Sequence, residues 1–132
     1  MKIKNIRIYI GYDSKEDIAY KVCKQSILNN SSIPVKIKSL KLYELISKKF
    51  YTRVVDPLAS TEFTYSRFLI PALANYQGWV IFCDCDFLFF QDISLLLDSL
   101  DDEKALYCVK HEYIPKEKHK MDGQKQTIYP RK

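Results

Sequence analysis

The tripeptide Asp84-Cys85-Asp86 interrupts an apolar stretch, and its position constrains the fold more than any other feature of the chain. Trp79–Cys83 precedes it and Phe87–Phe90 follows it directly. Burying an ionised carboxylate is costly unless it is paired or binds a metal. Residues i and i+2 of an extended chain point to the same side, so we expect Asp84 and Asp86 to converge on one Mg²⁺ or Mn²⁺, ions that prefer oxygen ligands. The alternative is a strand end with two solvated acids.

Length and composition indicate a single folded domain. The chain has 132 residues, of which 47% are hydrophobic, with only 3 glycines and 5 prolines. This is the composition of a globular protein and not of a disordered one. No apolar stretch reaches the roughly 20 residues of a membrane span, and the N-terminus lacks the apolar core of a secretory signal. We read Cys83 and Cys85 as small buried thiols and the chain as cytoplasmic and reduced.

The net charge of +5 is concentrated near the C-terminus. Residues 104–132 carry 8 basic and 3 acidic residues, whereas the preceding residues balance. This segment is either simply solvated or associates peripherally with an anionic membrane surface. Aromatic residues do not interleave with the basic ones as a nucleic-acid stacking surface requires. We therefore do not expect nucleic acid as a partner.

Strand-like and helix-like segments alternate along the chain. Alternating or continuous apolar residues predict strands, helical periodicity predicts helices, and Asp13 or Ser14 can cap the first helix. We expect that helix to bury Ile18, Val22, Cys23 and Ile27. The predicted strands are 6–10, 35–40, 79–83 and 105–109, and the predicted helices are about 15–28, 43–49, 61–74 and 92–97.

Such alternation predicts an α/β fold with a mainly parallel sheet and helices on both faces. Ligands of these sheets bind beyond the carboxyl ends of the strands. Gly11-Tyr12-Asp13 and Asp84-Cys85-Asp86 both lie at such ends. The topology therefore predicts one ligand site formed by these two segments.

Three blocks of sequence, taken in order, resemble family 8 glycosyltransferases, which are nucleotide-sugar enzymes of the GT-A fold. The blocks are Ile8–Asp13, Tyr65-Ser66-Arg67 and Ile81–Asp86, and the resemblance spans about residues 6–110. It implies that the first block holds the nucleoside, that Arg67 reaches the donor's phosphate and sugar, and that Asp84 and Asp86 bind Mn²⁺ or Mg²⁺. The donor-binding residues implied are Gly11, Tyr12, Asp13, Arg67, Asp84 and Cys85.

The resemblance also implies a reaction. The donor is a nucleoside-diphosphate sugar, expected to be a UDP-sugar, and the acceptor is a glycan or a lipopolysaccharide-type saccharide. Transfer retains the anomeric configuration, and no residue here can be assigned as the catalytic nucleophile. A divalent cation and a guanidinium are the groups expected to neutralise the negative charge of the departing diphosphate.

One departure from the family concerns length. Family members continue well past residue 132 and supply acceptor-site residues and a late histidine, for which His111 and His119 come too early. We therefore expect residues 1–110 to be the nucleotide-sugar-binding domain, only the N-terminal part of the GT-A fold. Residues 111–132 are expected to be the basic, mobile start of a missing C-terminal part. A chain truncated in this way is not expected to transfer sugar at a useful rate by itself.

Two other classes of protein fit parts of this pattern. A haloacid-dehalogenase-like phosphatase also places Asp-x-Asp after an apolar strand, with the first acid as nucleophile. However, Leu88 stands where that superfamily usually has Thr or Val. A non-enzymatic module, either an inactive donor-binding remnant or an interaction domain, is the second alternative. Cation-dependent binding of a nucleoside diphosphate would separate these interpretations.

Overall fold

The computed structural model describes residues 6–110, 116–119, 123 and 125. The chain divides into two compact units, residues 1–100 and 101–132. Every helix and strand among the described residues lies in the first unit. None of these helices is long and apolar enough to cross a membrane. Most of the segment 111–132, for which we predicted mobility, lies outside the described residues.

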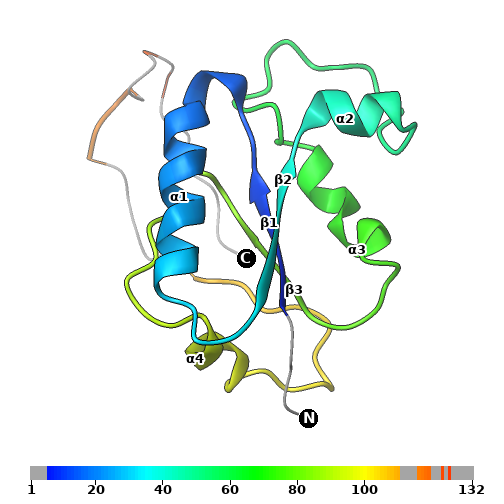
Figure 1. Cartoon of the computed structure of the whole chain (residues 1–132). Coiled ribbons are helices and arrows are strands. Elements are labelled where there is room, and N and C mark those ends of the chain that lie inside the picture. The colour runs from blue at the N-terminus through cyan, green and yellow to red at the C-terminus, as the bar shows by residue number, and fades with distance from the viewer. Residues whose placement is uncertain (1–5, 111–115, 120–122, 124, 126–132) are drawn as a thin grey trace. The chain divides into compact units, whose positions relative to one another are not determined.

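A three-stranded parallel sheet forms the centre of the first unit (Figure 1). Its order is β2-β1-β3, with β1 at Ile6–Gly11, β2 at Val35–Leu40 and β3 at Val80–Cys83. Ile6, Ile8 and Ile10 on one face of β1 are completely buried, and Tyr9 on the other face is 4% exposed, as expected of a central strand covered on both faces. The parallel α/β sheet predicted from the sequence is confirmed.

Helices cover both faces of this sheet. The helical segments are η1 Ser14–Glu16, α1 Asp17–Asn29, α2 Leu42–Ser47, η2 Ser66–Leu69, α3 Ile70–Leu73 and α4 Ser94–Leu97. On one face, Cys83 of β3 contacts Cys23 of α1, with 3.9 Å between the two sulfur atoms. On the other face, the Tyr9 hydroxyl donates to the Leu73 carbonyl of α3 at 3.4 Å. Successive strand residues therefore alternate between α1 and α3.

The buried face of α1 differs from the predicted one. Cys23 and Ile27 are buried, as predicted, but Ile18 is 78% exposed and Val22 51% exposed. The buried stripe instead includes Ser26, a polar residue that an apolar pattern does not reveal. Contact with β3 orients the helix so that Cys23 faces the sheet, which turns Ile18 and Val22 toward solvent.

The predicted helix 61–74 is not continuous. Residues 61–65 form turns, in which the Thr64 hydroxyl accepts the backbone N–H of Thr61 at 3.1 Å. Such side-chain bonds compete with helical ones. The following residues form the 3-10 segment η2 and then α3. Pro71 has no N–H to donate to the carbonyl of Arg67 four residues earlier, which favours the change of helix type at this point.

The predicted strand over 105–109 is also wrong. These residues form no strand, and all their side chains are exposed. A strand is stable only when it pairs with a neighbour, and the sheet of the described residues has no fourth member. Apolar composition alone was an insufficient signal for this segment.

Candidate functional site

The parallel pairing of β1 and β3 brings two predicted site segments together. Ile10 of β1 is the register partner of Cys83 of β3. Gly11 directly follows Ile10 and Asp84 directly follows Cys83, so both residues lie at the carboxyl edge of neighbouring strands. This is where parallel α/β sheets bind ligands.

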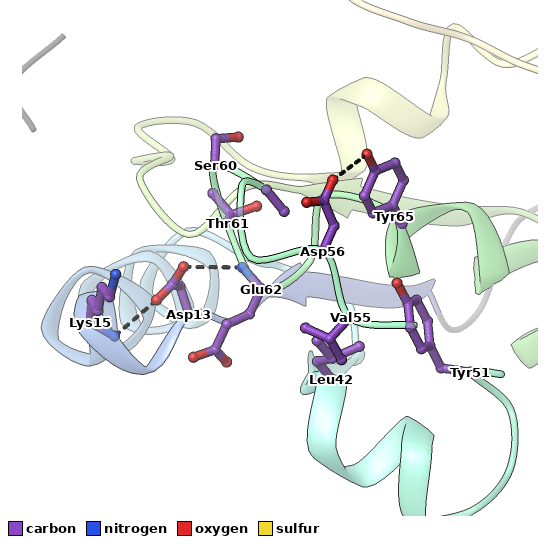
Figure 2. A pocket seen from close by; sticks show the side chains of 11 residues that line it. Asp13, Lys15, Leu42, Tyr51, Val55, Asp56, Ser60, Thr61, Glu62 and Tyr65 are labelled. Atoms are coloured by element: carbon purple, nitrogen blue, oxygen red, sulfur yellow. Dashed lines mark hydrogen bonds between the residues drawn. The ribbon is translucent and has the colours of Figure 1, made fainter. Parts of the chain in front are cut away.

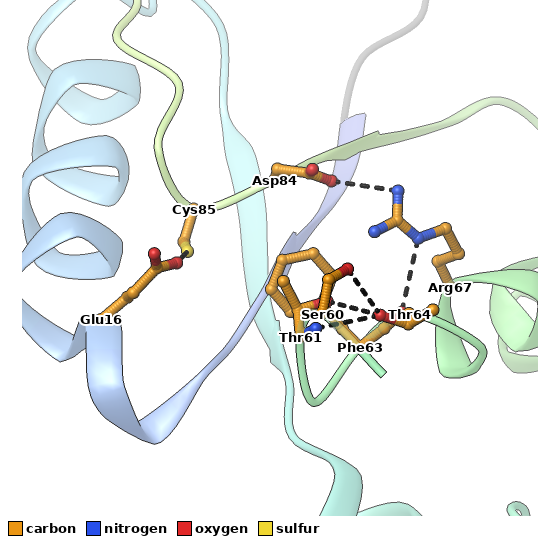
Figure 3. Close-up of polar contacts among 8 residues, drawn as sticks. All are labelled: Glu16, Ser60, Thr61, Phe63, Thr64, Arg67, Asp84 and Cys85. Carbon is orange, nitrogen blue, oxygen red and sulfur yellow. Dashed lines mark hydrogen bonds and ion pairs between the residues drawn. The ribbon is translucent and has the colours of Figure 1, made fainter. Parts of the chain in front are cut away.

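Arg67 reaches this edge from the start of η2. Its Nη1 lies 3.3 Å from Oδ1 of Asp84 (Figure 3). The guanidinium carbon is 5.1 Å from the ring centre of Phe63 and 5.2 Å from that of Phe82. Nε also donates to the Phe63 carbonyl at 3.4 Å. The two rings and the carbonyl hold a partly exposed cation in place beside the carboxylate.

Asp84 and Asp86 do not share one extended strand, contrary to the geometry we expected. Strand β3 ends at Cys83, and Cys85 and Asp86 form a turn. Asp84 is half-buried and Asp86 is exposed. After the turn, the backbone N–H of Phe89 donates to the Ser26 hydroxyl of α1 at 3.0 Å, which ties this segment to the helix.

Burial raises the pKa of the Asp84 carboxyl above its ordinary value, while the nearby Arg67 charge lowers it. The negative charges of Asp86 and Glu16 raise that pKa further. The carboxylates therefore repel one another, and Arg67 offsets this repulsion only in part. A bound cation would stabilise such a group.

The side chain of Cys85 points away from Asp84 and toward α1 (Figure 3). Its thiol is buried and donates to Oε2 of Glu16 at 3.0 Å. Burial, and then this hydrogen bond, raise the pKa of Cys85 to about 12. The thiol is therefore protonated at neutral pH. Because its side chain is turned toward Glu16, the donor contact that we predicted at Cys85 would have to involve the backbone.

Asp13 connects the end of β1 to the segment that carries Arg67. One carboxylate oxygen accepts the Lys15 backbone N–H at 3.0 Å, so Asp13 caps η1. We predicted that Asp13 or Ser14 caps the long helix, whereas the N-cap of α1 is Glu16, whose side chain makes no capping hydrogen bond. The other accepts the Glu62 N–H at 3.1 Å. Asp13 is only 6% exposed. Its first role is therefore structural, and nucleoside binding would use its remaining lone pairs.

Tyr12 is also held by neighbouring side chains. Its hydroxyl donates to Oδ1 of Asp17 at 3.0 Å, which raises the pKa of Tyr12. The ammonium of Lys41 lies 4.8 Å from the centre of its ring, and the ring of Tyr20 meets it edge-on at 5.3 Å. A half-buried aromatic ring fixed in this way can pack against a flat ligand without further ordering.

A cavity of about 130 Å³ opens beside Asp13 (Figure 2). Its walls include Asp13, Tyr51, Asp56, Ser60, Thr61 and Tyr65. Within it, the Tyr65 hydroxyl donates to Oδ2 of Asp56 at 3.1 Å. Hydroxyl and carboxylate groups of this kind can bond to the hydroxyls of a ribose or a sugar.

The residues at the edge fit a divalent cation in part. Asp84 and Asp86 supply the oxygen ligands that Mg²⁺ and Mn²⁺ prefer, and the excess negative charge favours a cation. In the described part of the chain, no group of three or more histidine, cysteine or acidic side chains is arranged to hold a metal. A cation bound here would therefore need oxygens from a substrate, from water or from other residues.

Sequence reasoning overlooked Phe63, Glu16 and Lys41. Lys41 directly follows the carboxyl end of β2, so the rule that located Gly11 and Asp84 would also have found it. Phe63 lies in the turns that we predicted to be helical. Glu16 lies on the first helical turn, and no sequence pattern linked it to Cys85.

Comparison with known proteins agrees with this geometry. Residues 4–130 match the family described as Glycosyl transferase family 8. The chain therefore belongs to glycosyltransferase family 8, and its sheet is consistent with the N-terminal part of the family's GT-A fold. The family assignment removes the phosphatase alternative.

A curated relative matches nearly all of the chain. It is Protein CDI of Arabidopsis thaliana, which is 54% identical over 129 residues. The match covers 98% of this chain and 50% of the relative, so the chain spans about half the length of that protein. No solved structure matches the chain.

Proposed function

We propose that this chain binds the donor of a metal-dependent retaining glycosyltransferase, and that the donor is a UDP-sugar. The observation that carries the proposal is the meeting of Arg67 with Asp84 at the carboxyl edge of β1 and β3. A cation and carboxylates from separate segments are what a nucleoside diphosphate and its metal ion require.

Each residue of the edge has a proposed role. Tyr12 and Asp13, with the backbone of Gly11, bind the nucleoside, because they lie where β1 ends and Tyr12 offers a fixed ring. Arg67 forms charge-assisted hydrogen bonds to the diphosphate, which its planar fork can contact at two oxygens.

Asp84 and Asp86 would hold Mn²⁺ or Mg²⁺. When bound, this ion supplies charge neutralisation for the departing diphosphate. Asp84 would then exchange its contact with Arg67 for the ion, which leaves the guanidinium available to the phosphate oxygens. The acceptor is proposed to be a saccharide, bound by residues beyond those described.

Nucleotide calorimetry tests the proposal. UDP should bind in Mn²⁺ or Mg²⁺, and binding should disappear in chelator. Asp84→Asn or Asp86→Asn should remove most of the affinity, whereas Asp98→Asn, an exposed acid on the same segment, should leave it unchanged. Equal UDP affinity in chelator and in Mn²⁺ would refute the proposal.

Arg67→Lys provides a second test of the same site. The point charge of lysine cannot replace the two-pronged contact, so UDP affinity should fall by about 1–3 kcal/mol. Arg53→Lys is the matched control, because Arg53 also lies over an aromatic ring, that of Tyr65, but does not pair with Asp84. Unfolding of the apo protein should barely change in either variant.

The alternative is a chain that binds donor without transferring sugar. The observation behind it is that, in the part of the chain that the structure describes, no third histidine, cysteine or acidic side chain joins Asp84 and Asp86 to hold a metal ion. Metal-dependent UDP binding without multi-turnover transfer to a saccharide would support this alternative. Slow metal-dependent hydrolysis of the UDP-sugar remains compatible with it, since water can replace an acceptor.

A further inference from the structure

A second cavity, of about 250 Å³, lies on the α3 face of the sheet and is lined by residues of β2, α2, α3 and the segments next to them. Figure 1 shows how these three elements are arranged. Three lysines line it: Lys38 on β2, Lys41 before α2 and Lys48 after α2. We refer to it as the lysine cavity. Neither Asp84 nor Arg67 contributes to its walls.

Positive charge is in excess in the lysine cavity. Its acidic wall residue is Glu44, which lies 4.0 Å from Lys41 Nζ and 3.9 Å from Lys48 Nζ. Both distances are long for ion pairs, and the two ammonium groups face the same carboxylate. Lys38 takes no part in the ion pairs formed by the described residues. The walls therefore carry two more positive than negative charges.

The floor of the lysine cavity is apolar. Tyr9 and Leu45 are buried there, and the Lys38 ammonium lies 5.8 Å from the centre of the Tyr9 ring. Leu73 of α3 continues this floor. Phe50 stands at the rim with half of its surface exposed. A ligand with both an anionic group and a small apolar group would match these two surfaces.

We propose that the lysine cavity binds a phosphate monoester that carries a small apolar group. A phosphate monoester has a charge of about −1.5 to −2 at pH 7, which matches the two excess positive charges. Lysine ammonium groups are strong point-charge partners for phosphate. The volume lies just below the roughly 300–1,000 Å³ of pockets for drug-sized ligands, so the ligand is small. Binding in this cavity needs no divalent cation and involves neither Asp84 nor Arg67, although Lys41 lies both on its wall and over the ring of Tyr12.

Phenyl phosphate is a suitable probe, titrated by calorimetry and by amide chemical shifts in the presence of a chelator. Inorganic phosphate and phenol each supply one half of the probe. Phenyl phosphate should bind more tightly than either and should shift the amides of Lys38, Leu45 and Asn75, which line the cavity. The double variant Lys38→Gln/Lys48→Gln should bind it about tenfold more weakly.

Lys21→Gln/Lys24→Gln is the matched control, because it removes the same charge from α1 on the opposite face of the sheet. It should leave phenyl phosphate affinity unchanged. An equal loss in both double variants would overturn the proposal, and so would equal binding of phenyl phosphate and inorganic phosphate or a Kd weaker than about 10 mM. Because the titration contains neither a divalent cation nor UDP, its failure would not bear on the donor site.

Discussion

Arg67 forms an ion pair with Asp84, one of the two carboxylates proposed to bind the metal ion. The side chains are 31% and 37% exposed, so both remain accessible to solvent and ligand. If the proposed metal ion binds, Arg67 would compete with it for Asp84 when no nucleotide is present. In the proposed complex with a diphosphate, the same guanidinium would have its own anionic partner.

Arg67→Met should accordingly change two affinities in opposite directions. Mn²⁺ should bind about twofold to fivefold more tightly in the absence of nucleotide, the effect expected from removing a partly exposed ion pair. UDP should bind more weakly in saturating Mn²⁺. Electron paramagnetic resonance of free Mn²⁺ measures the first change and calorimetry the second. Arg53→Met should alter neither, and weaker Mn²⁺ binding in Arg67→Met would contradict the competition.

Gly11→Ala should destabilise the fold. A Cβ on Gly11 would lie 2.6–2.7 Å from ring carbons of Phe63, which is itself 1% exposed. Overpacking of this kind costs about 1–3 kcal/mol in the free energy of unfolding, which urea denaturation would measure. Combining Gly11→Ala with Phe63→Leu should cost less than the sum of the single changes, because the smaller side chain makes room. Strict additivity would show that the two residues do not clash.

Ser26→Ala should loosen the segment that follows Asp86. The Ser26 hydroxyl donates to the Cys23 carbonyl at 2.7 Å and accepts the Phe89 N–H at 3.0 Å. Without it, a partly buried N–H loses its partner, at a cost of about 1–3 kcal/mol. Hydrogen exchange of the Phe89 amide should accelerate. Ser47→Ala, which removes an exposed hydroxyl bonded to its own helix, should leave that amide unchanged.

Stability should fall in acid partly because of Asp92. Hydrogen bonds from Ser32 and Ser94 lower the pKa of Asp92 to about 2 from an ordinary 3.8. A carboxyl whose pKa is lowered by folding stabilises the folded state when ionised. This stabilisation is present above about pH 4 and is lost as the pH falls toward 2.

Asp92→Asn should therefore lower stability at neutral pH and flatten the decline between pH 4 and 2. Urea midpoints measured from pH 2 to 7 would test this. Asp98→Asn removes an equal charge and controls for the loss of one carboxylate. If Asp92→Asn keeps the full acid dependence, the hydrogen bonds to Ser32 and Ser94 do not have this effect.

Local patterns determined much of the fold. The alternation of Val35–Leu40 predicted β2 with its correct bounds, and Asp13 is a capping residue, although it caps η1 and not the long helix α1 for which we predicted the cap. Periodicity, capping groups and apolar stretches act between residues close in sequence, so the sequence reveals them directly. The same is true of the two site segments, because parallel strands end at one edge.

Only the tertiary structure decided how these pieces meet. The pairing of Arg67 with Asp84 depends on how the segment before α3 packs on the sheet. The exposure of Ile18 depends on how α1 rotates against β3, and the position of Lys41 over Tyr12 depends on where α2 begins. Each of these features depends on residues that are far apart in the sequence, and no local sequence pattern reveals that they meet. Close packing of whole elements sets their distances, and that packing is a property of the assembled fold.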